Sequence, residues 1–261
     1  MRYRSYVPII VVLLVSLAPL SAAPGLVPIP EIMSTGVGLS EGAIDVSFLL
    51  ISAPAGVPVT TFDGFGNIVE PVFANVTCST VGCNGGPVTA FPFGSGYWLP
   101  NDARSQWEGV NPVQYGQIGE VGVTVGDPGG WYVFRTYFVL SEAARLTASI
   151  TGSWTADNWG GIFLNDPGTY GGGGISSFSD PWGFRSMRPF EVTSGFVAGI
   201  NYLDFRVYNL YQDIGNPVGF RVDMSGTYTS PGELVVPEPG TAALWLAGLA
   251  TLAILRRRKA S

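Results

Sequence analysis

Hydrophobic and polar positions alternate along much of the second half of the chain. In 146–154 apolar or small residues alternate with Thr and Ser, and 203–208 and 220–225 follow the same period. Residues 131–140 are rich in aromatic side chains, and 44–51 is the clearest strand-like run of the first half. A period of two is typical of a half-buried β-strand. The pattern therefore predicts many strands, and we find no helical period between the two chain ends.

Turn signals separate these runs. Asp127-Pro128-Gly129-Gly130 and the segment 165–168 combine Asn or Asp, which cap their own backbone, with Pro and Gly. The 36 Gly and 20 Pro of the chain also favour strands and turns. Residues 52–120 are rich in Gly, Pro and Asn, and we expect long loops there, laid over the sheets. The prediction is an all-β domain at 24–230, folded as a sandwich or jelly roll.

The N-terminus has the pattern of an export signal. Arg2 and Arg4 precede an apolar stretch at 7–20, and the small residues 21–23 follow it. A basic start, an apolar centre and a small-residue cleavage region are typical of a secretory signal peptide. We therefore predict a signal helix within 1–23 that is removed from the mature protein.

The C-terminus has a second pattern of this kind. After a linker at 231–236 come a Pro-Glu-Pro motif, an apolar stretch at 241–255 predicted as a transmembrane helix, and a basic end. As a helix, 241–255 is ~22 Å long, a short but workable membrane span. The basic end favours the cytoplasmic side, which places the rest of the chain outside. An ordinary membrane anchor is one interpretation, and a processed sorting signal is the other.

This order of features resembles the PEP-CTERM signal of Gram-negative bacteria, here at 237–261. The resemblance implies recognition by an exosortase-type enzyme, a transient stay in the inner membrane, and a final place on the outer surface or in the extracellular matrix. The residues that carry the sorting signal are Pro237, Glu238, Pro239, Arg256, Arg257 and Arg258.

The charge of the predicted mature region limits its partners. Six of the 13 basic residues and one of the 19 acidic residues lie in the terminal signals, which leaves seven Arg against 18 acids, or about −11. Nucleic acids and anionic lipid surfaces need cationic patches. We therefore expect no nucleic-acid partner, and contact with the membrane only through the C-terminal helix.

Two cysteines, Cys78 and Cys83, lie four residues apart in a Gly-rich segment. In an oxidising compartment such a pair closes a small disulfide loop. The alternative is half of a metal site, but the chain has no His and no other Cys to complete it. We predict the disulfide and no metal site at these residues.

A second resemblance covers most of the mature region. It is carried by Phe134-Arg135-Thr136-Tyr137-Phe138-Val139-Leu140 and by the segments 34–37, 101–107, 155–158, 162–165, 190–193, 199–205 and 217–222. These segments are similar to the galactose-binding-like jelly-roll domain found in many exported PEP-CTERM proteins. The resemblance implies the fold and says little about the ligand. A histidine that often follows the first strand in that group is absent here, so no role tied to it is carried over.

Two sets of residues are candidates for ligand binding. Asp157 and Asn158 end one predicted strand, and Asn165 and Asp166 follow the next, so their oxygens could bind a sugar or a structural Ca²⁺. The alternative is turn capping. The aromatic candidates are Trp154, Trp159, Tyr170 and Trp182, which surround a Gly-rich loop at 171–174. They either stack on sugars or fill the core, and we expect Trp159 and Trp182 to be the exposed ones.

We expect the protein not to be an enzyme. The chain has no His and no Gly-x-Ser-x-Gly elbow, which leaves only a carboxylate pair for catalysis, as in glycoside hydrolases. No catalytic residue and no cofactor are predicted, apart from the structural Ca²⁺ considered above. The first hypothesis is a surface or matrix protein that binds carbohydrate, such as exopolysaccharide. The alternatives are a purely structural matrix protein and a carboxylate-based glycoside hydrolase.

Overall fold

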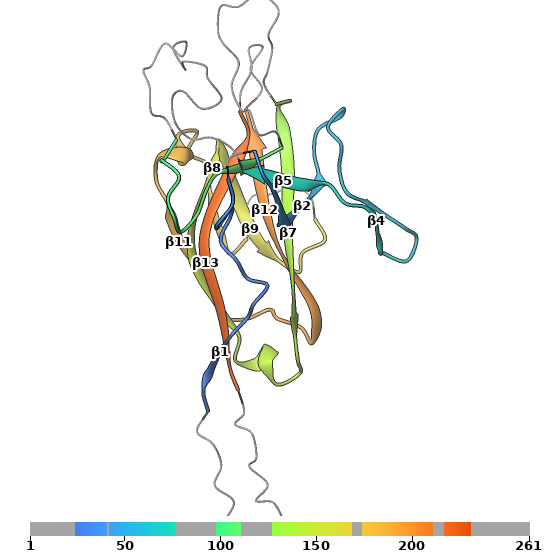
Figure 1. Ribbon diagram of the computed structural model, residues 1–261, viewed down its shortest axis with the longest axis vertical. Coiled ribbons are helices and arrows are strands. Elements are labelled where there is room, and N and C mark those ends of the chain that lie inside the picture. Colours follow the sequence, from blue (N-terminus) through green and yellow to red (C-terminus); the bar gives the residue numbers. More distant parts are fainter. Residues whose placement is uncertain are drawn as a thin grey trace, which may run out of the picture. The chain divides into compact units, whose positions relative to one another are not determined.

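A computed structural model describes residues 24–40, 42–76, 98–110, 127–168, 174–210 and 217–230 (Figure 1). One compact unit runs from Leu26 to Ser230, and a second comprises Met1–Gly25 and Pro231–Ser261. Both predicted terminal helices and both cysteines lie outside the described residues. Among the residues that are described, no helix is long and apolar enough to cross a membrane.

The described part of the chain is built from β-strands, with two single turns of 3-10 helix. The strands are β1 (Leu26–Pro28), β2 (Ile44–Ser52), β3 (Thr61–Phe62), β4 (Ile68–Glu70), β5 (Phe73–Val76), β6 (Glu108–Gly109), β7 (Gly130–Leu140), β8 (Ser149–Asp157), β9 (Trp159–Leu164), β10 (Ser176–Phe178), β11 (Arg188–Val192), β12 (Gly199–Asn209) and β13 (Gly219–Thr229), and the 3-10 turns are η2 (Ala144–Leu146) and η3 (Gly183–Arg185).

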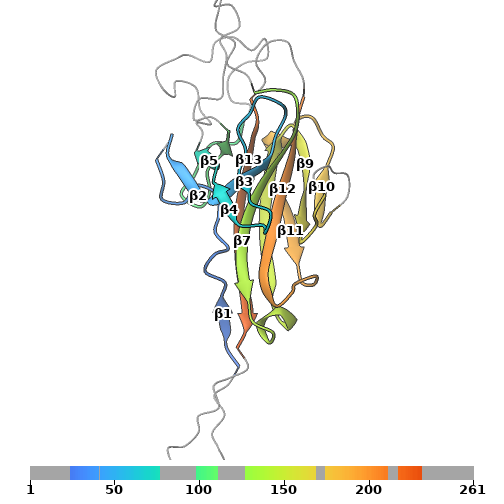
Figure 2. The ribbon, with the colours of Figure 1, turned by 90° about the vertical axis from the view of Figure 1, so that its right-hand side faces the viewer.

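The strands form two antiparallel layers. One layer has the order β10-β9-β12-β7-β2, and the other has the order β11-β8-β13 with β1 on β13 (Figure 2). The short strands β5 and β6 join β2 to β13 and so connect the layers along one side. From β7 onward the long strands alternate between the layers, β7, β9 and β12 in one and β8, β11 and β13 in the other. The predicted all-β sandwich is confirmed, and this alternation is consistent with a jelly roll.

Aromatic rings from both layers meet in the core. Phe220 on β13 lies against Phe48, Phe134 and Phe205 of the facing layer, with ring centroids 5.4, 4.5 and 5.4 Å away. All four rings are fully buried. Because side chains alternate along a strand, every second residue of these strands faces the core. The two-residue period in the sequence therefore identified the inner face correctly.

The structure corrects two details of the sequence analysis. The run at 146–154 is not one strand, because Leu146 ends η2 with 69% exposure and β8 starts at Ser149. The segment 52–120 is not only loops, since it contains β3, β4, β5 and β6. These strands have two to four residues each, which is too short for a period of two to be recognised.

The hairpin of β3 and β4 forms a two-stranded sheet of its own and projects from the sandwich in Figure 1. Its turn is braced by the carboxylate of Asp63, which accepts hydrogen bonds from the backbone N–H groups of Phe65 and Asn67, both at 2.8 Å. The side chain of Phe65 at the tip is 93% exposed. Phe65 therefore contributes almost nothing to the core.

Candidate functional site

Asp157 and Asn158 lie where the chain passes from β8 to β9. Asp157 is buried, and its Oδ2 accepts a hydrogen bond of 2.7 Å from the indole N–H of Trp98. Burial raises the pKa of Asp157 to about 8, and the Trp98 bond opposes this shift only in part. Asn158 is also buried, and it binds the carbonyl of Pro181 and the N–H of Leu210 at 3.3 and 2.8 Å. Both side chains brace loops at this end of the sandwich.

Asn165 lies at the other end of β9 and has a left-handed backbone conformation, with φ of 52°. Its amide donates to Asn201 at 2.9 Å and accepts from the N–H of Tyr202 at 3.0 Å. Asp166 caps the N–H of Gly168 at 2.8 Å. These are turn-forming contacts, as the alternative interpretation predicted.

The structure does not bring the two oxygen-bearing pairs together. The six residues of β9 separate Asn158 from Asn165, a path of ~20 Å in a strand. The Ca²⁺ considered from the sequence would need oxygens of both pairs around one ion. In the described part of the chain, no group of three or more His, Cys, Asp or Glu side chains could hold a metal.

The aromatic candidates divide between core and surface. Trp154 is fully buried, and its indole N–H donates to the hydroxyl of Ser176 at 2.9 Å. Trp182 precedes η3 and is 43% exposed, with the guanidinium of Arg185 4.4 Å from its ring centre. Trp159 is half-buried and is the first residue of β9 rather than part of a loop. Tyr170 lies outside the described residues.

Trp159 belongs to a row of three aromatic side chains, called here the aromatic row. Tyr208 on β12 is the direct partner of Trp131 on β7 and of Trp159 on β9. The Trp159 and Tyr208 rings stack at 4.8 Å with 10° between their planes, and Trp131 meets Tyr208 edge-on at 5.2 Å. Their chain neighbours Tyr132 and Val207 are core residues, so the row lies on the outer face of the five-stranded layer.

The N–H and O–H groups of the aromatic row have no hydrogen-bond partner among the described residues. All three side chains are half-buried, and no hydrogen bond from the described chain reaches the indole N–H of Trp131 or Trp159 or the hydroxyl of Tyr208. Such groups normally find a partner when they are partly buried. With no partner among the described residues, these groups allow the row to combine ring contacts with hydrogen bonds.

Sequence reasoning found Trp159 but missed Trp131 and Tyr208. Tyr208 ends an alternating run, so the outward direction of its side chain could be read from the sequence, whereas the aromatic-rich run that starts at Trp131 shows no such period. The pairing of β12 with both β7 and β9 could not be read from the sequence, because the three strands are not consecutive along the chain.

Below the aromatic row, the same face carries a buried ion-pair network. Arg135 on β7 makes a two-pronged bond to Asp204 on β12, with Nε–Oδ1 and Nη2–Oδ2 distances of 2.6 and 2.9 Å. Arg206 lies 3.5 Å from Asp204 and also 3.5 Å from Asp166. Burial raises the pKa of Asp204, and the two arginines oppose that shift. Two positive and two negative groups thus neutralise one another on this face.

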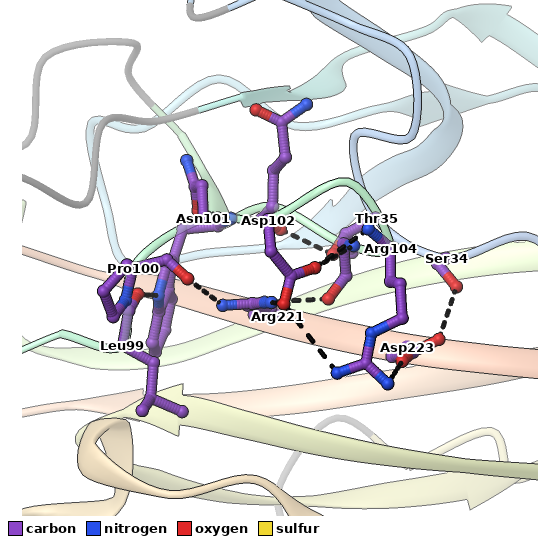
Figure 3. Close-up of polar contacts among 12 residues, drawn as sticks. Ser34, Thr35, Leu99, Pro100, Asn101, Asp102, Arg104, Arg221 and Asp223 are labelled. Carbon is purple, nitrogen blue, oxygen red and sulfur yellow. Dashed lines mark hydrogen bonds and ion pairs between the residues drawn. The ribbon is translucent and has the colours of Figure 1, made fainter.

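A second polar cluster, shown in Figure 3, lies on the outer face of the other layer. Arg221 on β13 donates to the hydroxyl of Ser105 at 2.8 Å, to the carbonyl of Pro100, and to Asp102 at 2.8 Å. Arg104 bridges Asp102 and Asp223, with N–O distances of 3.8 and 3.4 Å. The groups of this cluster bind one another, so it acts as a structural clamp that holds the 98–107 segment on β13.

The clamp also fixes two tryptophans over the end of the sandwich. Trp98 and Trp107 stack at 4.2 Å, and the indole N–H of Trp107 donates to the carbonyl of Leu99 at 2.8 Å. Trp107 is fully buried. Trp98 bonds Asp157 directly, so the stacked pair helps to keep that carboxyl group buried.

Two carboxyl groups, Glu108 on β6 and Asp45 on β2, are buried side by side. Asp45 accepts hydrogen bonds from the N–H groups of Gly36 and Ser47, at 2.9 and 2.8 Å. Glu108 is fully buried, and neither of its oxygens has a hydrogen-bond partner of normal geometry. Burial first, and then the neighbouring Asp45, raise the pKa of Glu108 well above its ordinary value. A protonated Glu108 beside an ionised Asp45 satisfies the pair.

This arrangement predicts the pH dependence of stability. Because the folded-state pKa of Glu108 is raised, its contribution is complete below the ordinary pKa of Glu and is lost as pH rises through the folded value. Glu108→Gln should therefore increase the free energy of unfolding at pH 8 by roughly 1–3 kcal/mol, the cost of an unsatisfied buried group. Urea unfolding of both proteins between pH 5 and pH 8 measures this difference.

The exposed Glu142, paired with Arg145, provides the matched control, and Glu142→Gln should leave the slope unchanged. Asp157 contributes a slope of the same sign between the ordinary pKa of Asp and its folded pKa of about 8, and that part should remain in the Glu108 variant. Parallel stability curves for the wild type and Glu108→Gln would contradict the assignment.

Comparison with known families finds a sorting motif in the C-terminal segment. Residues 235–259 match the PEP-CTERM protein-sorting motif. The match includes the sorting residues predicted from the sequence, from Pro237 to Arg258. It supports an exported protein that is sorted through the membrane by an exosortase-type enzyme. A comparison with curated proteins finds no match to the chain.

Proposed function

We propose that this exported protein is a non-enzymatic component of the outer cell surface or extracellular matrix, and that the aromatic row binds carbohydrate. The observation that carries the proposal is the register that aligns Trp131, Tyr208 and Trp159 on adjacent strands of one outer face. Sugars present apolar C–H faces beside hydroxyl groups, so they match rings that also carry N–H and O–H groups with no partner among the described residues.

The packing of the row limits where a sugar can bind. One face of the Trp159 ring is covered by Tyr208 at 4.8 Å, so a stacked sugar takes the other face. Tyr208 lies between its two neighbours, and it contributes its hydroxyl group more than its ring faces. The rings fix one another, which reduces the side-chain entropy lost on binding.

We also propose that the protein binds carbohydrate without cleaving it. The chain has no His to act as a general base. Beneath the half-buried rings of the row, Arg135, Asp204 and Arg206 on the same strands pair with one another. Glycoside hydrolysis needs a carboxylic acid and a second carboxylate placed ~5–10 Å apart across the substrate. Binding without cleavage therefore fits the face better than hydrolysis.

The test is affinity electrophoresis of the purified protein in gels that contain bacterial exopolysaccharides, both neutral and uronic-acid-rich. We expect at least one polysaccharide to retard the wild type, and Trp159→Ala to weaken binding about tenfold, or ~1.4 kcal/mol. Trp182→Ala is the matched control, because Trp182 is more exposed yet lies outside the row. Unretarded wild-type protein, or equal losses in both variants, would refute the proposal.

A further inference from the structure

One end of the sandwich is formed by the ends of several strands and by η2. The last residue of β7, Leu140, pairs there with the first residue of β12, Gly199. The hydroxyl of Thr147, which follows η2, accepts a hydrogen bond of 3.1 Å from the N–H of Thr229, the last residue of β13. Figures 1 and 2 both show β1, η2 and the end of β13 at this end.

Large aliphatic side chains are exposed at this end, which is called here the apolar end. Val139 on β7 and Ile200 on β12 are direct partners, each one residue inside the end of its strand. Leu26 starts β1, Leu146 ends η2, and Val197 lies just before β12. All five are 46–75% exposed. Single exposed aliphatic residues are common, but a group of them at one end of a domain marks an interaction site.

The chain leaves the domain at the apolar end. Thr229, the last residue of β13, is the partner of Leu26 on β1, and the sorting motif begins at residue 235. The ten residues 231–240 separate the domain from the predicted membrane span at 241–255. Even fully extended, ten residues reach only ~35 Å. The apolar end therefore stays close to the lipid surface as long as the C-terminal segment is in the membrane.

Charge does not oppose a lipid contact at the apolar end. The two charged side chains beside Leu146, Glu142 and Arg145, pair with each other. The acidity of the predicted mature region indicated contact with the membrane only through the C-terminal helix. Aliphatic side chains need no cationic patch, however, because they enter the lipid interface by leaving water.

We propose that the apolar end docks on the lipid surface while the C-terminal segment is still in the membrane. The short tether keeps this end at a high local concentration beside the lipid, so a weak contact is enough. A few aliphatic side chains do not hold a domain on a membrane by themselves, because stable anchoring needs a second signal. Removal of the C-terminal segment by the sorting enzyme therefore also ends the lipid contact.

The docked orientation keeps the aromatic row away from the lipid. Trp131 and Val139 are eight residues apart on β7, which corresponds to ~27 Å. The row thus lies towards the opposite end of the strands from the lipid contact. Docking does not depend on carbohydrate binding, and either proposal can fail without the other.

The experiment uses the full chain in phosphatidylcholine nanodiscs with one copy each, where some acyl chains carry a photoactivatable diazirine. Light attaches these lipids to the side chains that they contact, and mass spectrometry locates the labels. We expect labels in the segments 139–146 and 197–200 but not in the β3–β4 hairpin. The hairpin is the matched control, because it carries the highly exposed Phe65 but lies away from the apolar end in Figures 1 and 2.

A double variant tests the side chains themselves. Replacing Leu146 and Ile200 by Ser should lower the labelling of the apolar end about tenfold, since burial of one such side chain already favours contact by about that factor. Both side chains are exposed, so the variant should fold, and Phe65→Ser should leave the labelling unchanged. Adding anionic phosphatidylglycerol should not increase it. Unchanged labelling in the double variant, or labelling that requires the anionic lipid, overturns the inference.

The remaining outcomes also decide. Equal labelling of the hairpin and the apolar end overturns the inference, and so does a full chain that stays outside the discs, because the tether is then missing. Labelling that appears only with two copies in a disc would assign the apolar end to a second copy of the chain instead. Cleavage at a protease site inserted into 231–236 should abolish the labelling, and labelling that persists after cleavage contradicts the dependence on the tether.

Discussion

Phe220→Ala is expected to lower the free energy of unfolding by about 3–5 kcal/mol. The Phe220 ring is fully buried and contacts Phe48, Phe134 and Phe205 of the facing layer. Its removal leaves a cavity where the two layers meet, and the surrounding strands cannot collapse into it without losing their register. Urea unfolding followed by far-UV circular dichroism measures the loss.

The control for this prediction is Phe65→Ala in the β3–β4 hairpin. Phe65 is 93% exposed, so the same chemical change there should shift stability by less than about 0.5 kcal/mol. A similar loss in both variants would mean that Phe220 is not at the centre of the core.

Arg221→Ala is the second large expected effect, with a loss of about 2–3 kcal/mol in unfolding free energy. Breaking a buried ion pair costs about 3–5 kcal/mol when the remaining charge stays buried. Here the side chain of Asp102 is 44% exposed and can be hydrated again, which reduces the cost. The variant also leaves the hydroxyl of Ser105 and the carbonyl of Pro100 without their donor. Thermal and urea unfolding both report the change.

Arg145→Ala is the matched control, because Arg145 pairs on the surface with the exposed Glu142 three residues away. Exposed pairs of this type are worth about 0–1 kcal/mol. The clamp around Arg221 lies on the layer of β11, β8, β13 and β1, away from the aromatic row. Folded Arg221→Ala protein should therefore bind polysaccharide as the wild type does, and a specific loss of binding would contradict the structural role given to the clamp.

The sequence predicted the fold class well where strands are long. In β12, Leu203, Phe205 and Val207 alternate with polar residues, and the structure buries all three. It failed where strands have only two to four residues, as in β6, because so few residues show no period. The buried Glu108 was missed for this reason, although burial raises its pKa well above the ordinary value.

The candidate site was found only in part, because its residues come from strands that are distant in sequence. From the sequence, the oxygens of Asn158 and Asn165 were considered for one ligand at one edge, but the six residues of β9 place them at its opposite ends. Trp131 and Trp159, in contrast, are brought together by Tyr208, which follows them by 77 and 49 positions. Local pattern predicts which way a side chain points, while strand order decides which side chains meet.

Hydroxyl-radical footprinting of the exported protein, read by mass spectrometry with and without saturating polysaccharide, tests the central claim most directly. The account predicts that the polysaccharide protects Trp131, Trp159 and Tyr208, while Trp182 and Phe65 are oxidised at unchanged rates. Unchanged oxidation of Trp159 under saturating polysaccharide, or protection centred on Trp182, would contradict carbohydrate binding at the aromatic row.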